Sequence, residues 1–154
     1  MTRRYHVFIN DEAGSVGDTD QQARDITDEF RRAGVEANVV GVEPQRLPQA
    51  MREAWKDGTD VIVIAGGDGT VNCAAAVAIE ATLVLGVLPM GTFNHFAKDL
   101  GMPDDLSGAV RFLVQADITE VDVGEVNGRA FVNNASIGVY PKMVGEREDI
   151  RRRR

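Results

Sequence analysis

The chain has 154 residues, of which 44% are hydrophobic and 27% are charged, and its formal net charge is −7. This composition indicates one globular domain of ordinary size and excludes a disordered chain. The acidic balance argues against nucleic acid as the main partner. A single cysteine, Cys73, excludes an intrachain disulfide and favours a reducing compartment. Because no apolar run approaches the roughly 20 residues of a bilayer-crossing helix and no signal-peptide core precedes the first strand pattern, we expect a cytoplasmic protein.

The hydrophobic pattern predicts strands that alternate with helices. In chain order, it predicts a strand at 5–9, a helix from about 19 to 33, a strand at 35–42, a helix at 47–56, a strand at 60–65, a helix at 70–80, a strand at 83–88, a short helix from about 92 to 100 and a helix at 106–114. Such alternation implies a mostly parallel sheet that is covered by helices on both faces. We therefore expect an α/β fold of three layers, similar to a Rossmann domain.

The end of the chain predicts a change of architecture. Residues 119–126 and 129–134 have strand character, and the pair Asn127-Gly128 between them favours a two-residue type I′ hairpin turn. We expect residues 1–124 to form the α/β domain and residues 125–154 to begin a second, incomplete β domain that ends in a basic tail. Four arginines at residues 151–154 form that tail, which could contact anionic lipid or could be a solvated terminus.

The sequence VIVIAGGDGTVN at residues 61–72 is the most informative stretch. A β-branched run stops at two glycines, and an aspartate, a third glycine, a threonine and a helical pattern follow. A strand, a glycine turn and a helix N-terminus together present backbone N–H groups to a phosphate. Asp68 adds a negative charge to that turn, which suits phosphate only if Mg²⁺ lies between them. A tight turn that serves packing alone is the structural alternative.

A second motif, PMGTFN at residues 89–94, follows the next predicted strand. The order GGDGT-x-N and then P-x-GT-x-N, about twenty residues apart, resembles the diacylglycerol kinase catalytic-domain family of lipid kinases, which includes bacterial soluble enzymes and sphingosine kinases. Asn10 and Gly14 resemble the family's N-P-x-S-G loop, although Asp11 replaces its proline and Ala13 its serine. GGDGT alone is shared with NAD kinases, and the second motif favours the lipid kinases.

The resemblance implies the N-terminal nucleotide-binding domain of an ATP-dependent lipid kinase, with a fold like that of phosphofructokinases and NAD kinases. It implies transfer of the γ-phosphate of ATP to a lipid hydroxyl such as that of diacylglycerol, with Mg²⁺ as cofactor. The general base of such enzymes belongs to a second β domain, so we expect this chain by itself to bind ATP weakly and to turn over little. Contact with the inner membrane surface and a homodimer are left open.

The motifs carry these predicted roles onto specific residues. Asp68 is the candidate catalytic residue and Mg²⁺ ligand. The candidate nucleotide-binding residues are Asn10, Gly66, Gly67, Gly69, Thr70, Asn72, Gly91, Thr92 and Asn94. Thr92 is expected near the N-terminus of its helix, where further N–H groups would face the phosphates.

Other interpretations remain open at this point. Thr70 and Thr92 could only cap helices, and Asn72 and Asn94 could be structural hydrogen-bonding residues. Cys73 is expected to be a small buried thiol. For the whole chain, the alternatives to a lipid kinase are an NAD kinase-like enzyme and a non-catalytic nucleotide-binding or interaction module.

Overall fold

The structure is a computed structural model, and it describes residues 3–11 and 16–132. The elements in chain order are β1 (Tyr5–Asn10), α1 (Val16–Arg32), β2 (Ala37–Val42), α2 (Leu47–Lys56), β3 (Val61–Gly66), α3 (Asp68–Ala81), β4 (Leu85–Pro89), α4 (His95–Asp99), α5 (Leu106–Gln115), β5 (Gly124–Val126) and β6 (Arg129–Phe131). Residues 133–154, which include the expected basic tail at 151–154, lie outside the described part of the chain, as do Ala13 and Gly14 of the first loop.

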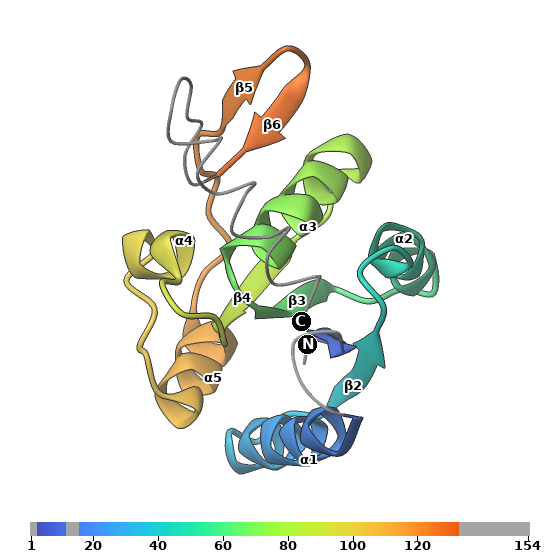
Figure 1. Cartoon of the computed structure of the whole chain (residues 1–154). Helices are drawn as coiled ribbons and strands as arrows, with labels where there is room; N and C mark the ends of the chain where they lie inside the picture. Colours follow the sequence, from blue (N-terminus) through green and yellow to red (C-terminus); the bar gives the residue numbers. More distant parts are fainter. Residues whose placement is uncertain (1–2, 12–15, 133–154) are drawn as a thin grey trace, which may run out of the picture.

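The first four strands form one parallel sheet in the order β2-β1-β3-β4. The chain moves from β1 outward to β2 and then returns across β1 to β3, so the direction of strand addition reverses between β1 and β3. Helices α1 and α5 pack together on one face, and α2 and α3 pack together on the other (Figure 1). The predicted three-layer α/β fold with a parallel sheet is therefore confirmed.

The sequence explains why β3 lies inside the sheet. All six of its residues are buried, which is what a strand needs when helices cover both faces of a parallel sheet. Strand β2 lies at the sheet edge, and none of its six residues is buried. The burial of β3 and of β2 thus matches their central and edge places in the sheet.

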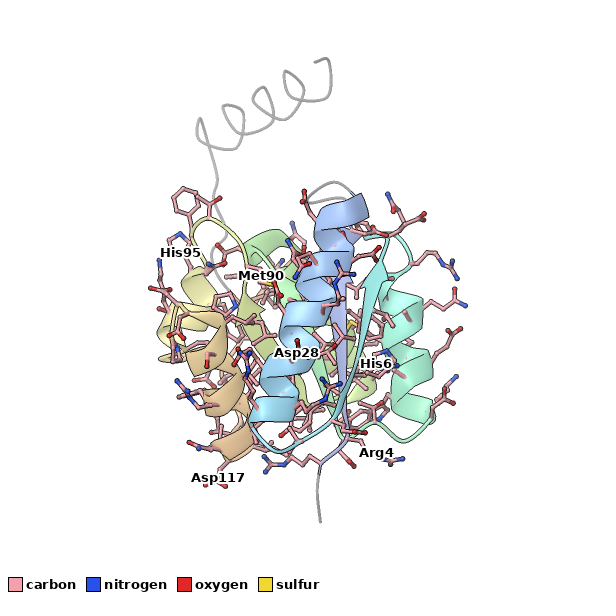
Figure 2. All side chains as sticks on the ribbon, turned by 90° about the horizontal axis from the view of Figure 1, so that it is seen from below. Arg4, His6, Asp28, Met90, His95 and Asp117 are labelled. Atoms are coloured by element: carbon pink, nitrogen blue, oxygen red, sulfur yellow. The ribbon has the colours of Figure 1, made fainter. Side chains whose placement is uncertain are left out.

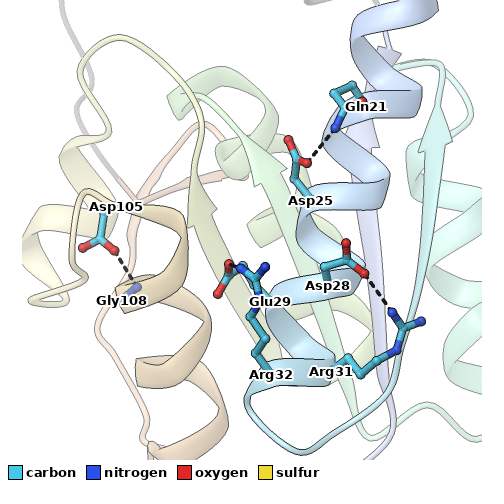
Figure 3. Close-up of polar contacts among 8 residues, drawn as sticks. All are labelled: Gln21, Asp25, Asp28, Glu29, Arg31, Arg32, Asp105 and Gly108. Atoms are coloured by element: carbon cyan, nitrogen blue, oxygen red, sulfur yellow. Dashed lines mark hydrogen bonds and ion pairs between the residues drawn. The ribbon is translucent and has the colours of Figure 1, made fainter.

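Helix α1 shows the same division between core and solvent. Its residues Ile26 and Phe30 are fully buried, and the Phe30 ring packs on Tyr5 of β1 with ring centroids 5.3 Å apart. The solvent side carries polar pairs three or four residues apart: Gln21 with Asp25, Asp28 with Arg31, and Glu29 with Arg32 (Figure 3). Exposed pairs of this kind contribute little stability, so the buried stripe holds α1 on the sheet.

Among the helix boundaries that differ from the prediction, two lie in the glycine motifs. Helix α3 begins at Asp68 rather than at residue 70, because Gly67 has extended backbone angles and acts as its N-cap. Helix α4 begins at His95 rather than near residue 92, because Asn94 has a left-handed backbone with φ of 52°. Thr92 therefore lies in the loop before the helix, and its predicted place at a helix N-terminus was wrong.

The predicted hairpin is present but shorter than expected. Its strands β5 and β6 have three residues each, and residues 119–123 are not part of a strand. Asn127 and Gly128 form the two-residue turn, and both have a positive φ, as a type I′ turn requires. None of the described helices combines the length and apolar composition that crossing a bilayer requires.

Replacing Phe30 by alanine should lower the free energy of unfolding by about 3–5 kcal/mol, because the change leaves a cavity between α1 and β1. Phe93→Ala is the matched control, since its ring is 64% exposed and its loss should change the free energy by less than about 0.5 kcal/mol. Urea unfolding followed by circular dichroism measures both values. Equal losses for the two variants would contradict the described core.

Candidate functional site

The two glycine motifs meet at the carboxyl edge of the sheet. Strands β3 and β4 are neighbours, and their register ends at the pair Gly66 and Pro89. The ladder continues one step into the loops, where the Met90 N–H donates to the Gly66 carbonyl at 3.2 Å. Met90 and His95 lie at the end of the molecule opposite to Arg4 and Asp117 (Figure 2). The motif loops therefore leave the sheet side by side and at the same end.

Gly67 and Gly91 bring the two loops into backbone contact. A Cβ on Gly67 would lie 3.2 Å from the Gly91 Cα, and a Cβ on Gly91 would overlap the Gly67 Cα. Neither glycine needs its freedom of φ here, because neither has a positive φ. What each position requires is the absence of a side chain, so that one main chain can pass directly against the other.

Asn94 closes the second loop upon itself. Its Oδ1 accepts a hydrogen bond from the Gly91 N–H at 2.8 Å, and its Nδ2 donates to the Gly91 carbonyl at 2.8 Å. The two ends of the side-chain amide thus hold both backbone polar groups of one residue, Gly91. Asn94 therefore fixes the shape of the loop, which is the structural role left open for it.

The N-terminus of α3 faces the space beside these loops. Gly67, its N-cap, supplies no side-chain hydrogen bond, and the N–H groups of a first turn have no carbonyl partner within their own helix. Gly69 is exposed, and a Cβ placed on it would meet no atom within 4 Å. Nothing in the described chain therefore requires glycine at position 69, whereas a ligand close to the backbone would.

Asn10 connects this helix to the neighbouring strand. Its Nδ2 donates to Thr70 Oγ1 at 3.1 Å across 60 residues of sequence. Thr70 lies in the first turn of α3, and its side chain fits against Gly66, where a Cβ would lie 3.1 Å from the Thr70 Cβ. The Asn10–Thr70 hydrogen bond joins β1 to the helix that follows β3, and the strand order reverses between β1 and β3. In open α/β sheets, ligands bind outside the carboxyl ends of strands at such a point.

Asp68 is the carboxylate that the two glycine motifs contribute to this site, and it occupies the first turn of α3. Among residues 3–11 and 16–132, no group of three or more histidine, cysteine or acidic side chains is arranged to hold a metal ion. A metal held by protein ligands alone therefore does not fit these residues. Mg²⁺ that is shared between one carboxylate and substrate phosphates does fit, because Mg²⁺ is usually bound in that way.

Most predicted site residues are thus brought together. The group at the carboxyl edge consists of Asn10, Gly66, Gly67, Asp68, Gly69, Thr70, Gly91, Thr92 and Asn94. Asn72 lies further along α3, and its Oδ1 accepts from the Val132 N–H at 3.0 Å. Cys73 is exposed rather than buried, which corrects the expectation for it. We refer to residues 66–70 and 90–94, together with Asn10, as the glycine cradle.

Sequence reasoning did not identify two features near the glycine cradle. The Met90 main chain extends the sheet ladder, which no side-chain pattern reveals. Phe93 is 64% exposed and stacks on His95, with ring centroids 5.7 Å apart and planes 7° apart.

Two surface hollows of about 720 Å³ lie at the amino ends of the strands, away from the glycine cradle, and Arg3 and Arg4 line both of them. Neither hollow includes a residue of the glycine cradle, so the position of these hollows does not indicate the candidate nucleotide site.

Comparison with known proteins finds diacylglycerol kinases both among family models and among individual relatives. The family model of the diacylglycerol kinase catalytic domain matches residues 4–126. A diacylglycerol kinase of Staphylococcus aureus (strain MRSA252) is 33% identical over 146 residues, which are 90% of this chain and 44% of the relative. A diacylglycerol kinase of Staphylococcus haemolyticus (strain JCSC1435) is 37% identical over 117 residues, which are 74% of this chain and 36% of the relative. The chain thus spans less than half the length of these relatives.

A solved structure supports the fold. The crystal structure of a diacylglycerol kinase from Bacillus anthracis str. Sterne superposes with a TM-score of 0.71 and 21% sequence identity, covering 94% of this chain and 52% of the other. At this level of identity, the likeness establishes the α/β architecture.

Gly91→Ala and Gly69→Ala should have opposite effects on stability. The methyl group at position 91 would push apart two packed loops and should cost about 1–3 kcal/mol of unfolding free energy. The methyl group at position 69 enters open space in a helix and should raise stability by about 0.5–1 kcal/mol. Urea unfolding of both variants checks this pair. A stable Gly91→Ala variant would refute the described contact between the loops.

Proposed function

Because the chain belongs to the diacylglycerol kinase catalytic domain family, we propose that it supplies the nucleotide-binding part of an ATP-dependent lipid kinase. In the proposed reaction, the γ-phosphate of ATP passes to a hydroxyl of diacylglycerol. The family supports a lipid acceptor over the NAD of the alternative interpretation. For this chain by itself, which spans 44% of the S. aureus relative, we propose nucleotide binding with little turnover.

One observation carries the proposal, namely the joined loops beside a helix N-terminus whose N-cap is a glycine. Gly67 and Gly91 hold two backbones in contact, and Gly69 leaves open space above the first turn of α3. Phosphate binds well at such a place, because the helix dipole and the N–H groups of the first turn both favour an anion. The open space at Gly69 would allow phosphate oxygens to approach the main chain closely.

Thr70 and Asn10 would orient the phosphates in this arrangement. The Thr70 hydroxyl accepts from the Asn10 amide at 3.1 Å, so its own proton remains to be donated in another direction. A phosphate oxygen beside the first turn of α3 would be a suitable acceptor. Asn10 would therefore act on the nucleotide partly through the orientation that it gives to Thr70.

Asp68 would hold Mg²⁺ together with the phosphates. When bound, Mg²⁺ neutralises phosphate charge and stabilises the transferring group. Without it, the carboxylate in the first turn would repel a triphosphate, although it is favourable for the helix dipole. The positioning of phosphate and the neutralisation of its charge are the main requirements of phosphoryl transfer, and the glycine cradle offers groups for both.

MgATP should bind the chain, and Asp68→Asn should weaken that binding by about tenfold, the loss of one charge-assisted contact. In EDTA, the same variant should bind ATP more tightly than the unchanged chain, because it removes a negative charge without removing a metal ligand. Asp117→Asn is the matched control, since Asp117 is exposed at the opposite end of the molecule (Figure 2). Isothermal titration calorimetry measures all these affinities.

No heat and no chemical-shift change with MgATP would refute the proposed function. Equal weakening by Asp68→Asn with and without metal would refute the role of Asp68 in holding Mg²⁺. Titration with NAD in place of ATP tests the alternative, and tighter binding of NAD than of MgATP would favour an NAD kinase-like enzyme. Contact with a membrane and a homodimer stay predictions.

A further inference from the structure

We propose that Asn72 is a positioning residue that ties the β5–β6 hairpin to the helix of the glycine cradle, and that it is not a ligand of the nucleotide. The part of this proposal that concerns ATP rests on the proposed function. The part that concerns the hairpin rests on contacts within the chain alone.

The contact joins two segments that are far apart in sequence. Asn72 is half-buried on α3, and its Oδ1 accepts from the Val132 N–H at 3.0 Å over a separation of 60 residues. Val132 follows the last residue of β6, so the hairpin ladder has ended before its N–H group. The Val132 side chain packs against the hydrophobic core. The chain is therefore fixed to α3 immediately after the hairpin by one polar and one apolar contact.

The hairpin itself is compact. A Cβ on Gly124 would overlap the ring of Phe131, so the ring lies directly on the Gly124 backbone. Yet a hairpin of two three-residue strands has little stability of its own. Its place in the molecule must come from its packing against α3, where β6 contacts the helix (Figure 1). The Asn72 contact is the directional part of that packing, since a hydrogen bond fixes both distance and angle.

Helix α3 carries both the first turn of the glycine cradle and Asn72, and these two places lie close together. Gly69 in the first turn and Asn72 are three residues apart, which is about 4.5 Å along the helix axis. An anion that orders the first turn therefore restricts the backbone from which Asn72 projects. We expect ATP at the glycine cradle to reduce opening of the Asn72–Val132 hydrogen bond, because α3 is a continuous rigid element between them. Asn72 would thereby set the direction in which the chain leaves the α/β domain relative to the phosphates.

Amide hydrogen exchange tests the tie between α3 and the hairpin. Asn72→Ala removes the acceptor and should speed exchange at Val132 by about tenfold, as expected for one hydrogen bond. Asn72→Asp keeps an acceptor oxygen and should retain slow exchange. Asn38→Ala is the control, because Asn38 also makes a side-chain hydrogen bond but lies on β2 beside His6. It should leave Val132 unchanged.

MgATP supplies the second readout. It should slow exchange at Val132 in the unchanged chain and in Asn72→Asp, but not in Asn72→Ala, while the calorimetric affinity of Asn72→Ala for MgATP stays within about twofold. A tenfold or greater loss of affinity with unchanged Val132 exchange would overturn the proposal and make Asn72 a nucleotide ligand. Faster exchange throughout the sheet in Asn72→Ala would also overturn it, since the residue would then support general stability. If MgATP does not bind the unchanged chain, the proposed function is wrong. The exchange rate of the Val132 amide without nucleotide then still tests whether Asn72 holds the hairpin on α3.

Discussion

The backbone contact between Gly67 and Gly91 is the constraint on which the rest of the site depends. It exists because β3 and β4 are adjacent parallel strands whose register ends at Gly66 and Pro89. With any side chain at position 91, the loops would separate and the hydrogen bond between Met90 and Gly66 would be strained. The contact turns two loops from different parts of the sequence into one continuous backbone surface beside the start of α3.

The sheet order then determines what this surface can meet. The strand order reverses between β1 and β3, and ligands of open α/β sheets bind at the carboxyl ends of strands at such a point. Asn10 comes from one of them and Thr70 follows the other, and their hydrogen bond closes the gap. The site is therefore built from main chain that follows β3 and β4 and from two side chains, Asn10 on β1 and Thr70 on α3.

The fold could be predicted from the sequence because its strongest signals are local. The uninterrupted β-branched run before Gly66 marks a central strand, and the Asn127-Gly128 pair marks a turn in which both residues have a positive φ. Helix α3 was harder, because alanines occupy both its buried and exposed positions and give little periodicity. This explains the wrong expectation that Cys73 would be buried.

The details of the site depend on contacts that sequence does not reveal. The start of α4 is delayed by the double hydrogen bond of Asn94 to Gly91, which is a three-dimensional arrangement rather than a propensity. The partner of Asn72 lies 60 residues away, and no local pattern indicates it. The motifs could thus predict which residues gather, but not which side chains are already engaged within the chain. Their roles toward a nucleotide stay predictions.

The empty cap at Gly67 has a consequence for the lifetime of the protein in a cell. A glycine N-cap leaves the helix start less stable than a serine or aspartate would, by about a few tenths of a kcal/mol, and a bound phosphate would interact with the same N–H groups. Ligand binding to the folded state alone adds about 2.7 kcal/mol of stability when the ligand is at one hundred times its dissociation constant. If ATP binds as proposed, resistance to proteolysis would therefore follow the energy supply of the cell, and a chain starved of nucleotide would be degraded sooner.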